Sequence, residues 1–264
     1  MDRELYYKYY QENLELLNHE INMVKKSAQA ALGKKAWLER NSPTSPQLPS
    51  TEVEIKAGTR LYTFLICSWL EARLMKMLYE NSAAAFSDLQ ITQIRQNGTM
   101  AKKWEMSFTL AICNSYNFNY APNLDYSLRF SANSLQQRNY QDVKNFLQDI
   151  SDAITIRNRL AHGQWAVQFN SANTELEAFS FFQKYDNIQK LGILQQCFNH
   201  IANIISAYAT YKDKQNAAFD LAIRKEVDEI ENKKRRIASC DFSKYMNALS
   251  NNYENKLKLL RGKD

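Results

Sequence analysis

The chain has 264 residues, of which 45% are apolar and 23% charged, with only six glycines and four prolines. This composition predicts a globular, mostly helical protein. No apolar run reaches the roughly 18–20 residues that span a bilayer, and the charged start does not resemble a signal peptide, so we expect a cytoplasmic protein with no membrane contact. The four cysteines lie more than 40 residues apart without a Cys/His cluster, so we expect neither a metal site nor a cofactor.

The first predicted element is one long helix over residues 2–40. At 1.5 Å per residue it would run roughly 55–60 Å, which needs another helix along its length. Residues 41–50 hold three of the four prolines and are predicted to be a linker. One face of this helix carries an apolar heptad stripe, whose residues are spaced alternately by three and four. They are Tyr7, Tyr10, Leu14, Leu17, Ile21, Val24, Ala28 and Ala31.

Three further amphipathic helices are predicted in the middle of the chain, over residues 61–79, 101–116 and 142–161. In the third, Asp142 is the expected N-cap and Gly163 the expected left-handed stop. This places His162 in the last turn of the helix.

The stretch from Arg157 to His162, RNRLAH, carries the most chemistry. Histidine exchanges a proton near neutral pH, and arginine binds phosphate oxygens through its planar guanidinium. Asn158 and His162 are four residues apart and share a helix face. Arg157 points roughly 140° away from His162 on an ideal helix, so the two meet only if the helix end unwinds or a second copy supplies one of them.

Arginine, a polar residue, three further residues and histidine at a helix end resemble the motif of the HEPN superfamily, in a branch of bacterial defence and toxin proteins. The segments 61–79 and 101–116 resemble its first two core helices, and the likeness spans residues 55–210. The resemblance implies an all-α, HEPN-like helical bundle that cuts RNA without a metal ion, leaving a 2′,3′-cyclic phosphate. It also implies a homodimer in which both motifs line one cleft, with Arg157, Asn158 and His162 as catalytic residues and an antitoxin or regulatory protein as a further partner.

After the motif, alternating apolar residues predict a small β-hairpin over residues 165–182. A long helix is then expected from about residue 187 to 238, its distal half leaving the core, followed by a last amphipathic helix. The final 32 residues carry nine basic and three acidic side chains. They include one basic run that is a candidate RNA-binding segment or a helix C-terminal cap: Lys233, Lys234, Arg235 and Arg236.

These observations divide the chain into residues 1–50 (long helix and linker), 51–210 (catalytic core) and 211–264 (helical extension). The predicted function is a metal-independent endoribonuclease that acts as a toxin or anti-phage effector. Two alternatives remain open, namely a non-cleaving module that binds nucleotide or RNA, and a coiled-coil interaction protein. The sequence motifs of P-loop NTPases, GxSxG hydrolases and HExxH metalloproteases are absent.

Overall fold

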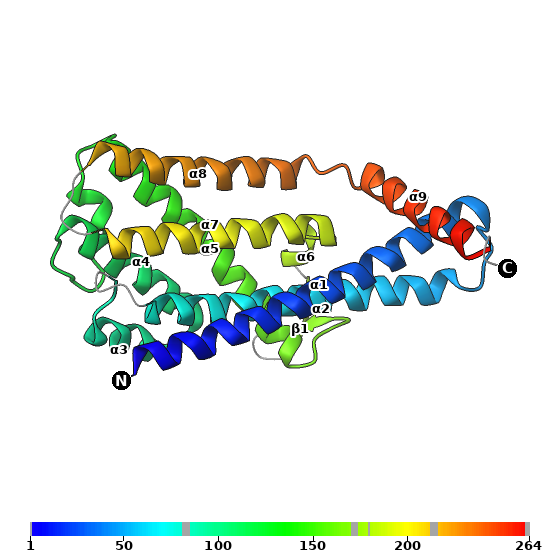
Figure 1. The fold of residues 1–264 in the computed structure, drawn as a ribbon, viewed down its shortest axis with the longest axis horizontal. Helices are drawn as coiled ribbons and strands as arrows, with labels where there is room; N and C mark the ends of the chain where they lie inside the picture. Colours follow the sequence, from blue (N-terminus) through cyan, green and yellow to red (C-terminus); the bar gives the residue numbers. More distant parts are fainter. Residues whose placement is uncertain (1, 81–84, 170–173, 179, 212–215, 262–264) are drawn as a thin grey trace.

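The computed structural model describes residues 2–80, 85–169, 174–178, 180–211 and 216–261. It is a mostly helical bundle with one short β-hairpin, so the predicted all-α class is confirmed (Figure 1). The elements, in chain order, are α1 (Arg3–Asn41), α2 (Leu48–Tyr79), α3 (Asp88–Gln96), α4 (Met100–Tyr116), the 3-10 turn η1 (Tyr126–Arg129), α5 (Leu135–Ala161), β1 (Gln168–Phe169), β2 (Leu176–Glu177), α6 (Ser180–Lys184), α7 (Ile188–Thr210), α8 (Ala217–Ala238) and α9 (Phe242–Arg261).

The long N-terminal helix is confirmed, and its apolar stripe packs within the chain. Helix α1 lies along α2, and its C-terminal half also contacts α9 (Figure 1). Leu14, Ile21 and Ala28 of the stripe are buried in the core. Helix α9 approaches so closely that a Cβ on Gly33 would lie 2.6 Å from the carbonyl oxygen of Leu249. The heptad pattern therefore reflects packing against two helices of the same chain.

The proline-containing segment is a tight turn rather than the linker that we expected. Helix α2 already begins at Leu48, with a proline in its first turn, where the missing N–H has no helical partner to lose. Helices α1 and α2 run antiparallel (Figure 1). The division of the chain at residues 50 and 210 stays a prediction.

The motif helix α5 begins seven residues before the position that we expected. Ser134 caps it, accepting a hydrogen bond from the Gln137 N–H at 3.2 Å. The expected cap, Asp142, lies inside the helix, and its carboxylate accepts a hydrogen bond from Arg224 of α8 at 2.6 Å. The prediction was wrong because the apolar spacing of residues 143–156 also fits a helix that starts earlier.

The long C-terminal helix that we expected is two antiparallel helices. Helix α7 ends at Thr210, and α8 begins at Ala217 and returns along α7 and α5 (Figure 1). The carboxylate of Asp220, in the first turn of α8, is buried and accepts a hydrogen bond from the Tyr116 hydroxyl at 2.5 Å. Helix α9 packs against α1, whereas α8 lies along α7 and α5, so the distal half of the predicted helix stays on the core.

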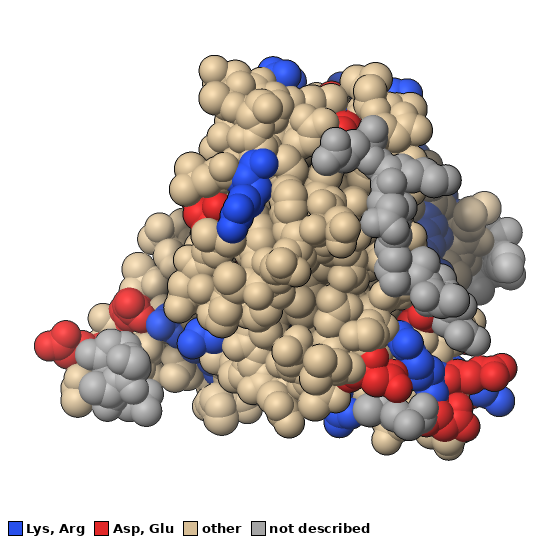
Figure 2. Space-filling model, turned by 90° about the vertical axis from the view of Figure 1, so that its left-hand side faces the viewer, with Lys and Arg blue, Asp and Glu red and all other residues tan. Residues whose placement is uncertain are grey.

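The middle of the bundle end that carries residues 117–134 shows few charged side chains, whereas charged side chains of both signs gather along the lower edge of this view (Figure 2). Asp125 and Arg129 are the charged residues of that segment. This end therefore offers little attraction to a polyanion, and the motif at the end of α5 lies elsewhere. Among the described helices, none combines the length and apolar character that crossing a bilayer requires.

Asp149 of α5 joins three elements. Its carboxylate lies 2.7 Å from Lys184 of α6 and 2.6 Å from Lys234 of α8, and it accepts a hydrogen bond from the Tyr185 hydroxyl at 3.1 Å. Burial alone would raise the pKa of Asp149, but the hydrogen bonds and charges of the two lysines hold this pKa below its ordinary value.

We predict that Asp149→Asn lowers the free energy of unfolding by about 1–3 kcal/mol, because it removes the charge of a buried carboxylate that faces two partly exposed lysines. Urea denaturation measures this loss, and Asp152→Asn, an exposed change on the same helix, is the control. Since the folded pKa is depressed, the stabilisation is present above the ordinary aspartate pKa of about 3.9 and disappears as the pH falls through the folded value. A difference between wild type and variant that stays constant down to low pH would contradict this account.

Candidate active site at the end of helix α5

Helix α5 stays regular to its last residue and ends in a Schellman motif. His162 is the C-cap, with φ −92° and ψ 21°, and Gly163 takes the left-handed conformation at φ +81°. The Gln164 N–H donates to the Arg159 carbonyl at 3.0 Å, and the Gly163 N–H donates to the Leu160 carbonyl at 3.1 Å. The predicted stop at Gly163 is confirmed, and the helix end does not unwind.

The Arg157 side chain points toward helix α2. Its guanidinium forms an ion pair with Glu71, and the two side chains are 22% and 32% exposed. Cys67, one turn earlier on α2, is buried; burial raises the pKa of its thiol, and the positive charge of Arg157 opposes that rise. Arg157 is therefore held against α2 by a partly desolvated contact.

Asn158 and His162 are exposed on a different face of the helix. Among the described residues, no hydrogen bond or ion pair joins either side chain to Arg157. The backbone N–H of His162 donates to the Asn158 carbonyl at 3.0 Å, as in a regular helix. Two of the three predicted catalytic residues therefore share a solvent-facing surface, and the third faces α2.

The predicted hairpin is present beside the motif, but it is shorter than the expected span of residues 165–182, because Phe181 and Phe182 lie in helix α6. Strands β1 and β2 pair antiparallel, with Phe169 opposite Leu176, and residues 170–173 lie outside the described part of the chain. The side chain of Gln164 accepts a hydrogen bond from the Phe169 N–H at 3.1 Å, which ties the helix end to the hairpin. Trp165, three residues after His162 in the sequence, is 36% exposed, so an accessible indole follows the motif closely along the chain.

The basic run Lys233–Arg236 does not form one surface. Lys234 turns inward to Asp149, whereas Lys233 lies 3.7 Å from Glu229 and Arg235 lies 3.4 Å from Glu231. Arg236 is exposed near the start of α9. Successive residues rotate by about 100° around a helix, so four in a row cannot face one partner. An RNA-binding role for this run stays a prediction.

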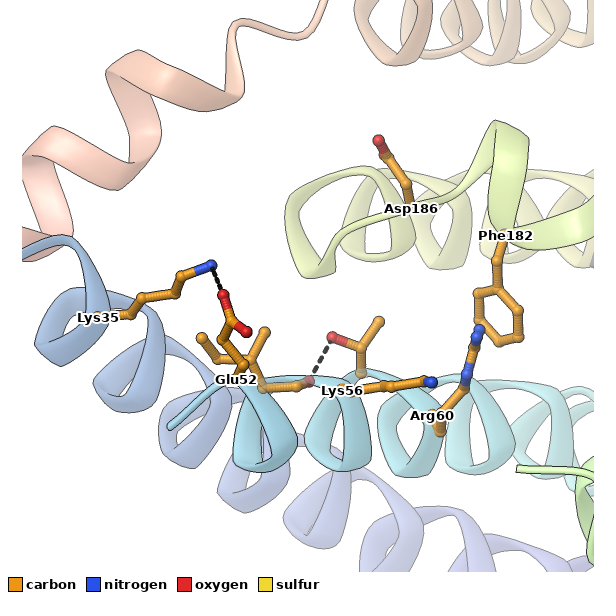
Figure 3. A pocket seen from close by; sticks show the side chains of 8 residues that line it. Lys35, Glu52, Lys56, Arg60, Phe182 and Asp186 are labelled. Carbon is orange, nitrogen blue, oxygen red and sulfur yellow. Dashed lines mark hydrogen bonds and ion pairs between the residues drawn. The ribbon is translucent and has the colours of Figure 1, made fainter. Parts of the chain in front are cut away.

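A cavity of about 350 Å³ lies between the end of α1, the start of α2 and helix α6 (Figure 3). Lys35 reaches Glu52 at 2.8 Å, and the Arg60 guanidinium lies over the Phe182 ring, 3.3 Å from its centroid. Burial lowers the pKa of Arg60 to about 10. No local pattern in the sequence marks Arg60, because its surroundings come from distant segments.

An apolar groove of about 560 Å³ lies beside the ion pair of Arg157, on the surface of α1 and α2. Its lining includes Tyr10, Leu16, Met75 and Glu71, and Leu16 is 62% exposed. Sequence reasoning missed Glu71. The available signal was that Glu71 is the only charged residue in the apolar stretch of residues 61–72. A lone acid in such a stretch predicts a cationic partner.

Comparisons with protein-family models, with curated proteins and with solved structures found no match for this chain.

We predict that Arg157 and Glu71 are energetically coupled. In a double-mutant cycle of Arg157→Ala and Glu71→Ala, the coupling energy in urea denaturation should be about 1–2 kcal/mol, because the pair is partly desolvated. The control pair is Arg159 and Glu177, 2.9 Å apart and more exposed, for which we expect under about 1 kcal/mol. Equal coupling in the two pairs would contradict the view that α2 anchors Arg157.

Proposed function

We propose that the protein is a metal-independent endoribonuclease of the HEPN type that acts as a homodimer. The observation that carries the proposal is the placement of the motif at a sharply terminated helix end. There His162 and Asn158 are exposed together, close in the sequence to an accessible tryptophan. Aromatic side chains next to a catalytic group suit single-stranded RNA, whose bases stack on them.

The chemistry is a transesterification within the RNA strand. The ribose 2′-oxygen loses its proton and attacks the adjacent phosphorus, while the bond to the 5′-oxygen breaks and that oxygen gains a proton. The products are a 2′,3′-cyclic phosphate and a free 5′-hydroxyl. His162 transfers one of these protons, Arg157 stabilises the charge that develops on the phosphate, and Asn158 orients the histidine or the phosphate by a hydrogen bond.

Two copies are needed because one chain keeps the two ends of its motif, Arg157 and His162, on different sides of α5. Arg157 faces α2, whereas His162 faces solvent on another side of α5. The guanidinium has five N–H donors, and one carboxylate uses at most two of them, so the pair with Glu71 leaves donors for a phosphate. The apolar groove next to Glu71 gives a second copy a surface to cover.

The cellular role that fits this activity is that of a toxin or an anti-phage effector, held in check by an antitoxin or another regulatory protein. This part rests on the resemblance of the motif alone. A non-cleaving module that binds RNA or nucleotide through the same residues is the second candidate. The ion pair between Arg157 and Glu71 favours this candidate, because it offsets the positive charge that cleavage would need to stabilise the phosphate.

We predict that the purified protein cleaves single-stranded RNA in the presence of EDTA and leaves 2′,3′-cyclic phosphate ends. His162→Ala should lower the rate by about 100-fold or more, because it removes the group that transfers a proton. Arg157→Ala should have a similar effect through the lost charge stabilisation. The matched control is His19→Ala, which changes an exposed histidine on α1 and should leave the rate unchanged.

The outcomes separate the candidates. RNA that binds but stays intact, with binding lost in Arg157→Ala, would favour the non-cleaving module. Cleavage that survives His162→Ala, or that needs a divalent ion, would contradict the proposed mechanism.

A further inference from the structure

A small pocket adjoins the motif on the side of the β-hairpin. It has a volume of about 210 Å³ and lies between α5, the hairpin and α6. We call it the hairpin pocket, and its lining includes Thr155, Arg159, Gln168, Glu177, Phe181 and Tyr185. At about 30 Å³ per water molecule, this volume would hold several waters. It is therefore large enough for one planar ring system.

The pocket opens on the helix face that carries His162. Thr155, Arg159 and His162 stand at positions i, i+4 and i+7 of the same helix, and Asn158 stands at i+3, so the four form one stripe. Along the helix axis, Arg159 and His162 are about 4.5 Å apart. An RNA strand whose phosphate lies at His162 therefore brings a neighbouring base to the mouth of the pocket.

The charges around the pocket indicate an uncharged ligand. Two cations, Arg159 and Lys184, are matched by two carboxylates, Asp152 and Glu177. The balance gives no net attraction for a phosphate. Phe181 and Tyr185 supply an apolar, aromatic floor, which favours a flat heteroaromatic group.

The polar groups at the mouth present donors and an acceptor side by side. The Arg159 guanidinium lies 2.9 Å from the Glu177 carboxylate, which also accepts a hydrogen bond from the Gln168 side-chain amide at 3.0 Å. The side chains of Arg159 and Glu177 are 25% and 49% exposed, and such a pair contributes little stability. A ligand can therefore exchange its own hydrogen bonds for those of the pair.

Guanine matches this arrangement better than the other bases. Its O6 and N7 atoms accept hydrogen bonds, as an arginine requires, and its N1–H and N2–H groups donate, as a carboxylate requires. Adenine presents an amino group where guanine has O6, and the pyrimidines lack N7. We propose that the hairpin pocket binds an unpaired guanine of the RNA substrate next to the scissile phosphate. The position of this guanine next to the scissile phosphate rests on the proposed role of His162. Binding of guanine in the pocket does not depend on that role.

The first test measures binding without cleavage. By calorimetry, His162→Ala protein should bind GMP more tightly than AMP, CMP or UMP. Glu177→Gln, made in the same background, should weaken GMP binding at least about tenfold and remove the preference, because the carboxylate that accepts from N1–H and N2–H is lost. Glu175→Gln changes an exposed acid of the same segment outside the pocket and should leave GMP binding unchanged. Absence of GMP binding, equal binding of the four nucleotides, or full affinity in Glu177→Gln would overturn the proposal.

The second test distinguishes an RNA base from a free nucleotide. Trinucleotides with 2′-O-methyl groups cannot be cleaved, and the one with a central guanine should compete with GMP, whereas the one with a central uracil should not. Competition by neither would make the pocket a mononucleotide site and overturn the RNA assignment. Selective guanine binding together with no RNA cleavage in EDTA would contradict the proposed ribonuclease activity and still support guanine binding in the pocket.

Discussion

The regular ending of helix α5 determines what the motif can do. Because the helix keeps its geometry to Ala161 and stops at the left-handed Gly163, the orientations of Arg157 and His162 are fixed relative to each other. The arginine is held against α2 by Glu71, and the histidine stays in solvent with Asn158. The proposed dimer and the proposed guanine pocket both follow from this division. The dimer covers the groove beside Glu71 on the Arg157 side, and the pocket lies on the face of α5 that carries His162.

The sequence predicts the features that periodicity and local capping determine. The stripe from Tyr7 to Ala31 predicts the long first helix, and Gly163 predicts the helix stop, because only glycine adopts a left-handed conformation without strain. The short hairpin after the motif follows from the change of apolar spacing from three and four to two. These signals lie within a few residues of the structures that they predict.

Features that depend on distant segments escape this reasoning. The apolar spacing continues from α7 into α8, and periodicity does not reveal that the chain reverses between them. The partner of Arg157 lies 86 positions earlier in the sequence, and the hairpin pocket needs α5, the hairpin and α6 to be in place. Lys234 belongs to a basic run that the sequence leaves open as an RNA-binding segment or a helix C-terminal cap, and tertiary packing turns this lysine inward to Asp149. Pairings of this kind are set by the folded chain.

In the proposed dimer, the arginine and the histidine of one working site come from different copies of the chain. Subunit mixing tests it most directly: Arg157→Ala and His162→Ala proteins are unfolded, refolded together and assayed for RNA cleavage in EDTA. Each variant alone should be nearly inactive, and the mixture should regain a substantial part of the wild-type rate, because mixed dimers contain one intact arginine and one intact histidine facing each other. A mixture that forms dimers and stays as inactive as the separate variants would contradict the account.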